Sequence, residues 1–206
     1  MICEREEMMN SELEPKSMLS LHSILPRSRA NGPGVRFVVW FQGCTRNCPG
    51  CFNPKTHTRP ARENISVEAL CEQILVESDF IQGVTISGGE PFEQAEGLAE
   101  LVRAIRLKSD ISILVFSGYT LGEIRKIPSG TSVLENIDVL IAGPYNRTQH
   151  LGHHLLGSAN QQMCLLTGRY TEADIVQVPR SEVVLSVDGD IHLSGVAPIT
   201  FPVATV

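Results

Sequence analysis

The stretch VRFVVWFQGCTRNCPGCFNP, residues 35–54, joins a run of β-branched and aromatic residues to three cysteines. Its first part, 35–42, has the composition of a β-strand. The three cysteines follow at the spacing C-x3-C-x2-C, and no fourth cysteine stands close behind Cys44, Cys48 and Cys51. Cysteines at such spacing in one loop are typical of metal ligands, so this stretch indicates a metal-binding loop at the end of a strand.

The composition is that of an ordinary globular protein, with 42% hydrophobic and 19% charged residues in a chain of 206. A formal net charge of −6 argues against binding to nucleic acid, which needs clustered Lys and Arg. The N-terminal segment 1–18 is acidic and polar and lacks the apolar core expected of a signal peptide, and we expect no run long enough to span a bilayer. We therefore expect a cytoplasmic protein, away from membranes. In that compartment its six cysteines are interpreted as thiols or metal ligands in preference to disulfides.

Strands and helices are predicted to alternate after a flexible tail at residues 1–18. Continuous apolar runs predict the strands, and apolar residues at helical spacing predict the helices. The predicted strands cover 35–42, 83–87, 111–116 and 138–142, and the predicted helices cover 66–78, 93–108 and 121–127. Such alternation implies an α/β fold in which helices cover a parallel sheet.

The pattern changes near the end of the chain. Residues 182–195 alternate in the manner of a β-hairpin that turns at Asp188-Gly189. An isolated hairpin is only marginally stable in water, so we expect this one to pack on the α/β domain.

Four unusual loops follow the four predicted strands. GCTRNCPGC follows the first strand, SGGEP (87–91) the second, SGY (117–119) the third and AGP (142–144) the fourth. Ligands bind at the carboxyl ends of parallel strands, where such loops share one rim. The sequence therefore predicts a binding site at this rim.

Three thiolates alone leave the kind of metal open. A structural zinc site needs four ligands, and His57 could complete a Cys3His set. A [4Fe-4S] cluster normally takes four cysteines, and one held by three keeps an iron open to an external ligand. The SGGEP loop favours the cluster, because its glycines admit a ligand and the Glu90 carboxylate can accept hydrogen bonds from an ammonium group.

Taken together, these motifs resemble those of the radical S-adenosylmethionine (SAM) enzymes. Within that superfamily the chain is most similar to the small activating enzymes of anaerobic ribonucleotide reductase and other glycyl-radical enzymes. The matching motifs, in family order, are NGPGVR (31–36), GCTRNCPGCFN (43–53), ISGGEP (86–91), SGYTLGEI (117–124), DVLIAGP (138–144) and LLGSANQ (155–161).

The resemblance implies a mechanism and a set of roles. Cys44, Cys48 and Cys51 would bind three irons of a [4Fe-4S] cluster, and SAM would chelate the fourth. Reductive cleavage of SAM would give a 5′-deoxyadenosyl radical, with no catalytic residue beyond the cluster. The expected SAM-binding residues are Ser87, Gly88, Gly89, Glu90, Ser117, Tyr119 and Asn160.

The resemblance also implies a fold and partners. The fold would be a partial TIM-like β/α barrel over 19–180, with 181–206 as a C-terminal β-hairpin extension of the same domain. The partners would be a glycyl-radical enzyme, on which a glycyl radical is installed, and a flavodoxin- or ferredoxin-type reductant. The hairpin would shape the side that faces the partner enzyme.

Two other functions remain open on the sequence. The small activating enzymes end near the motif at 157–161, whereas this chain continues for 45 residues, which allows a radical SAM enzyme with a different substrate. A non-enzymatic, cysteine-rich zinc-binding module is the second alternative. Three further cysteines and three histidines lack ligand spacing and are predicted to be no metal site: Cys3, Cys71, Cys164, His150, His153 and His154.

Overall fold

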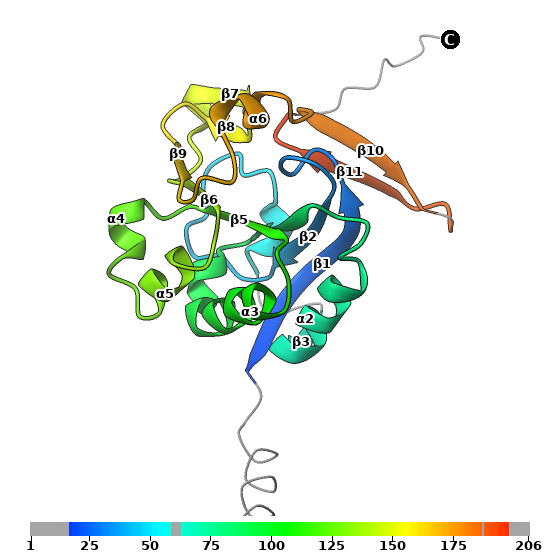
Figure 1. Cartoon of the computed structure of the whole chain (residues 1–206). Helices are drawn as coiled ribbons and strands as arrows, with labels where there is room; N and C mark the ends of the chain where they lie inside the picture. Colours follow the sequence, from blue (N-terminus) through cyan, green and yellow to red (C-terminus); the bar gives the residue numbers. More distant parts are fainter. Residues whose placement is uncertain (1–16, 59–62, 187, 198–206) are drawn as a thin grey trace, which may run out of the picture.

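The strands of the main sheet follow the order β3-β1-β2-β4-β5-β6-β9 in the computed structural model, which describes residues 17–58, 63–186 and 188–197 (Figure 1). The strands are β1 (Met18–Ser28), β2 (Arg36–Phe41), β3 (Glu63–Ser66), β4 (Gly83–Gly88), β5 (Ser112–Ser117), β6 (Val139–Ala142) and β9 (Gln162–Leu165). The central strands β2, β4, β5 and β6 are parallel, while β1, β3 and β9 pair antiparallel at the two sides. The centre of the sheet is thus the predicted parallel one.

Most of the helices cover one face of this sheet. The helices are α2 (Val67–Val76), α3 (Ala95–Lys108), α4 (Leu121–Ile124), α5 (Gly130–Leu134) and α6 (Glu172–Val176), and the 3-10 turns are η1 (Pro54–Thr56), η2 (Pro91–Gln94) and η3 (Arg147–Gln149). Helices α2 and α3 lie side by side below the sheet in Figure 1, and their apolar residues form one core with β1, β2, β4 and β5. The Ser66 side chain accepts a hydrogen bond from the amide of Ala69 and caps α2, as predicted.

The opposite face is covered by shorter elements. Helix α6 and the small hairpin of β7 (His150–His153) and β8 (Leu156–Ser158) lie above the sheet in Figure 1. A second core joins this layer to β5 and β6 and contains Leu114, Ile141, Leu155 and Ile175. The strands between these layers are buried on both sides, which is why they read as continuous apolar runs in the sequence.

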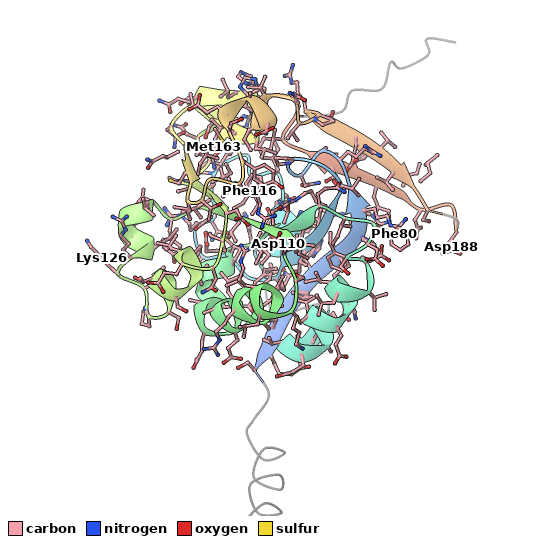
Figure 2. All side chains as sticks on the ribbon, viewed as in Figure 1. Phe80, Asp110, Phe116, Lys126, Met163 and Asp188 are labelled. Atoms are coloured by element: carbon pink, nitrogen blue, oxygen red, sulfur yellow. The ribbon has the colours of Figure 1, made fainter. Side chains whose placement is uncertain are left out.

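The C-terminal hairpin consists of β10 (Ser181–Leu185) and β11 (Ile191–Gly195), as the sequence predicts. It projects beyond the body, with Asp188 at its outer tip (Figure 2). The predicted turn at Asp188-Gly189 lies within a longer loop, because the last pair of the ladder is Leu185 with Ile191. The side that packs on the body is polar, since the Glu182 carboxylate accepts hydrogen bonds from the Ser28 hydroxyl and the Arg29 amide.

Strands β1, β3 and β9 were not predicted from the sequence. Residues 1–16 of the predicted tail lie outside the described residues, and Met18 already begins β1. The curvature of a partial barrel and the domain bounds 19–180 and 181–206 stay predictions. Within the described part of the chain, no helix is both long and apolar enough to cross a membrane.

Candidate functional site

The three cysteines and the SGGEP loop line one cavity of about 130 Å³ at the carboxyl ends of β2, β4 and β5. We call it the cluster cavity. The predicted site residues that line it are Cys44, Cys48, Cys51, Ser87, Gly88, Gly89, Glu90 and Ser117. The parallel strands, whose carboxyl ends meet at one edge of the sheet, therefore bring together side chains that are up to 73 positions apart, from Cys44 to Ser117.

The cysteine loop is closed by backbone hydrogen bonds. The amide of Gly43 donates to the carbonyl of Thr56 at 2.7 Å, and that of Cys44 donates to His57 at 3.4 Å. Inside the loop, the Cys51 amide donates to the Cys48 carbonyl at 3.1 Å. The two ends of the loop are thus fixed next to each other, and the three thiols reach the cavity from a defined turn.

The SGGEP loop packs directly on the cysteine loop. The Glu90 amide donates to the carbonyl of Gly43 at 2.8 Å, and the Gly89 amide donates to that of Phe41 at 2.8 Å. A Cβ atom on Gly89 would lie 2.2 Å from the Gly43 oxygen, and one on Gly88 would lie 2.4 Å from the Phe41 nitrogen. These two glycines therefore allow the SGGEP loop to approach the backbone of Phe41 and Gly43 closely, and they also line the cavity.

Glu90 is the buried carboxylate of the site, with 1% of its surface exposed. Its oxygens accept hydrogen bonds from the Ser117 hydroxyl at 2.8 Å, the Gly118 amide at 2.7 Å and the Phe92 amide at 3.1 Å. Desolvation raises the pKa of Glu90 to about 7, although these donors and Arg46 act in the opposite direction. A carboxylate has about four acceptor positions, so one remains for a ligand donor such as an ammonium group.

The thiols fit an iron–sulfur cluster. Burial raises the pKa of Cys44 and Cys51, and for Cys44 the negative charges of Glu90 and Glu93 add to this effect. Thiols of raised pKa hold their protons at neutral pH, and coordination to iron removes them. The other described cysteines, Cys71 and Cys164, do not line the cavity, so its thiol donors are Cys44, Cys48 and Cys51, and His57 lies in the same lining.

Two of the expected SAM-binding residues do not line the cavity. Tyr119 lies under the guanidinium of Arg46, 4.6 Å from ring centroid to Cζ. The Asn160 amide donates to the Pro144 carbonyl at 2.8 Å. Both hold neighbours of the cavity in place, and Gln161, next to Asn160, lines the cavity itself.

The histidine-rich segment makes ring contacts. The His153 and His154 rings meet edge to face, 4.2 Å between centroids, while His150 Nδ1 lies 3.2 Å from the Tyr145 hydroxyl. Among the residues that the structure describes, no three His, Cys, Asp or Glu side chains are arranged to hold a single metal ion.

Several residues of the cavity lining were not predicted from the sequence, among them Arg46, Phe52, Phe116 and Tyr145. Arg46 lies between two of the cysteines, and its charge favours the ionised form of Glu90. Phe52, Phe116 and Tyr145 form apolar wall, with the Phe52 and Tyr145 centroids 4.8 Å apart. Arg46 and Phe52 stood inside the quoted motif, but Phe116 and Tyr145 have no spacing that would single them out.

Comparison with known proteins agrees with these features. The family model described as "4Fe-4S single cluster domain" matches residues 30–164. The anaerobic ribonucleoside-triphosphate reductase-activating protein of Vibrio cholerae is 31% identical over 69% of this chain and 96% of its own length. The protein of the same name from Enterobacteria phage T4 is 28% identical over 68% of this chain and 90% of its own.

Another relative has a higher sequence identity to this chain, but over a shorter part of it. A Haemophilus influenzae protein, named as a glycyl-radical enzyme activating enzyme, is 39% identical over 48% of this chain. That match spans only 38% of the Haemophilus protein. The family match nevertheless includes all three cysteines and the SGGEP loop. The chain belongs to the 4Fe-4S single cluster domain family, and it is a radical SAM protein of the small activating-enzyme type.

Proposed function

We propose that this protein is a radical SAM activating enzyme that installs a glycyl radical on a partner enzyme. The observation that carries the proposal is that three thiols and the SGGEP loop line one cavity, with no further described cysteine among its lining residues. A set of three thiols suits a cluster that keeps one iron open for an external ligand. The names of the two relatives that match over most of their length support the activating role.

The residues divide into two groups in this proposal. Cys44, Cys48 and Cys51 would hold a [4Fe-4S] cluster, which with SAM supplies the one-electron cleavage to a 5′-deoxyadenosyl radical. The backbone of 87–89 and the free acceptor position of Glu90 would bind the methionine end of SAM. Tyr119 and Asn160 would support this pocket by holding Arg46 and Pro144.

The walls of the cavity would protect the reaction. Phe52, Phe116 and Tyr145 place aromatic surface beside the thiols and keep water away from a reactive intermediate. A sheet curved into the partial barrel predicted from the sequence would leave the rim open to a protein. The partner would be a glycyl-radical enzyme, and the electron would come from a flavodoxin- or ferredoxin-type protein.

Two measurements on anaerobically reconstituted protein test this proposal. A cluster gives a broad absorption band near ~400 nm that bleaches on reduction, whereas zinc, which has no redox chemistry, gives none. With reductant and SAM, we expect 5′-deoxyadenosine and methionine in equal amounts. A protein that holds zinc and leaves SAM intact would instead be the zinc-binding module, and SAM cleavage without transfer to any glycyl-radical enzyme would favour a different substrate.

A further inference from the structure

A second and larger cavity, of about 700 Å³, adjoins the cluster cavity. We call it the side chamber, and its lining includes Ser23, Trp40, Phe116, Tyr145, His192 and Ser194. Its volume lies within the range of ligand sites, about 300–1,000 Å³. Phe52, Ser87, Phe116 and Tyr145 are among the residues that line both cavities. A molecule in the side chamber would therefore meet SAM bound at the SGGEP loop.

The floor of the side chamber is a row of side chains across the sheet. Ser23 of β1 pairs with Trp40 of β2, which in turn pairs with Ser87 of β4. Paired residues on neighbouring strands point to the same face of a sheet. All three line the side chamber, whereas the neighbours Val39 and Phe41 belong to the core under the helices. The floor thus lies on the sheet face opposite helices α2 and α3.

The opposite wall is strand β11 of the C-terminal hairpin. Ile191, His192, Leu193 and Ser194 all line the side chamber. The hairpin is held there by the Asn31 amide, which donates to the Ser194 hydroxyl at 2.5 Å, and by the Glu182 contacts at the start of the β1–β2 connection. Because the family match ends at residue 164, this wall comes from a part of the chain outside that match.

The lining of the side chamber has a distinct charge. Lys55, His22 and His192 are its ionisable bases, and no Asp or Glu of the described chain belongs to its lining. The remaining polar groups are hydroxyls and amides, such as those of Ser23, Asn31 and Gln161. Neutral and acidic groups are therefore favoured in this chamber, and basic groups are disfavoured.

The outer surface of the hairpin is apolar and continuous with the chamber. Val183 pairs with Leu193, and Leu185 pairs with Ile191, so the four side chains share one face. They are 45%, 54%, 70% and 64% exposed, in that order. Ile191 and Leu193 also line the side chamber, so the apolar face continues into its mouth. A small molecule held in the chamber would not contact this outer face, whereas a bound protein would bury it.

We propose that the C-terminal hairpin is a substrate-binding element, and that the side chamber takes an extended, neutral-to-acidic polypeptide segment of the partner protein. This inference rests on the function proposed above. The apolar hairpin face would contact the surface of the partner, while the segment enters between β1 and β11. Its glycine would give one Cα hydrogen atom to the 5′ carbon released from SAM, so that one C–H bond breaks, one forms, and the unpaired electron stays on that Cα.

Two synthetic octapeptides serve as probes of this site. Both have a central glycine with two deuterium atoms on Cα, flanked in one peptide by aspartates and in the other by lysines. Trp40 is the single tryptophan of the chain and lies on the chamber floor, so its emission reports peptide binding to the full-length reconstituted protein with SAM. We expect the acidic peptide to change this emission, to bind about tenfold or more tightly than the basic one, and to transfer deuterium to 5′-deoxyadenosine.

A pair of matched variants locates the site at β11. Leu193→Glu adds a carboxylate to the chamber wall at a position exposed enough for the charge to be solvated. It should weaken binding of the acidic peptide about tenfold or more. Val76→Glu introduces the same carboxylate at an exposed position on α2, across the sheet, and should leave peptide binding and SAM cleavage as in the wild type.

The outcomes separate this inference from the proposed function. A wild-type protein that forms no 5′-deoxyadenosine contradicts the proposed function itself. If SAM is cleaved but both peptides bind alike, or Leu193→Glu binds the acidic peptide as tightly as Val76→Glu does, the hairpin is no substrate-binding element. Binding without deuterium transfer would equally overturn the role of the side chamber.

Discussion

Glu90 accepts a hydrogen bond from the amide of Gly118 at 2.7 Å, and this contact joins the loops that follow two neighbouring strands, β4 and β5. Ser117 adds a second bond to the same carboxylate at 2.8 Å. The side chain that the sequence marks as a ligand for an ammonium group is therefore also a brace between two loops of the rim. Its titration should be visible in stability as well as in SAM binding.

The pH dependence follows from the direction of this shift. Burial raises the Glu90 pKa to about 7, above the ordinary value of 4.5. The folded state thus binds a proton more tightly than the unfolded state, so the contribution to stability is complete below pH ~4.5 and is lost as the pH rises through ~7. Its size is on the order of 3 kcal/mol. Urea unfolding of wild type and Glu90→Gln at pH 5 and pH 8 measures it, and we expect the variant to lose less stability than the wild type over this interval. Parallel losses in both proteins would contradict the assignment.

Gly89 should be needed for the cysteine loop and not only for SAM. A Cβ atom there would lie 2.2 Å from the carbonyl oxygen of Gly43, the residue before Cys44. We expect Gly89→Ala to cost about 1–3 kcal/mol or more and to reduce iron content and SAM binding together. Iron analysis and equilibrium dialysis with SAM check this. Gly168→Ala is the control, because nothing lies within 4 Å of the added atom. Normal iron content in Gly89→Ala would mean that the loops can separate without loss of the cluster site.

Arg36 should be a main contributor to stability at the opposite end of the sheet. Its side chain is fully buried and donates to the Thr85 hydroxyl at 3.1 Å and the Val84 carbonyl at 2.6 Å. Burial lowers its pKa to about 10. Arg36→Met keeps much of the volume but leaves these acceptors unpaired, and we expect a loss of about 2–4 kcal/mol in urea unfolding. The exposed Arg103 gives a matched control, Arg103→Met, with little expected change. Equal stability of the two variants would contradict a structural role for Arg36.

The parallel centre of the sheet could be predicted because its strands are buried on both faces. Strand β1 could not, since its apolar residues are interrupted by Ser20, His22 and Ser23, and the exposed Pro26 and Arg27 follow them. Strands β3 and β9 are short, and their membership depends on pairing with β1 and β6. Each of these strands has only four residues, which is too short for an alternation of apolar and polar residues to be recognised in the sequence.

The site was predicted where residue type and strand position coincide. Cys44 and Glu90 lie in loops that follow two parallel strands. The expectation that ligands bind at the carboxyl ends of such strands was therefore enough to place them in one site. Tyr145 reaches the cavity because the chain turns back after β6, and Trp40 lines the side chamber because strand β11 comes to lie opposite this face of the sheet. Such placements depend on loop paths and strand pairing, which local sequence does not encode.

The most direct test of the central proposal is the amount of 5′-deoxyadenosine formed by cysteine variants under strong reductant. We expect Cys44→Ala, Cys48→Ala and Cys51→Ala each to abolish its formation, because two thiolates cannot hold a cluster that already lacks a fourth protein ligand. Cys71→Ala is the matched control, since Cys71 is buried in the core under the helices and does not line the cluster cavity. Wild-type amounts from Cys71→Ala and none from Cys48→Ala are the predicted result, and 5′-deoxyadenosine formation retained in Cys48→Ala would contradict the proposal.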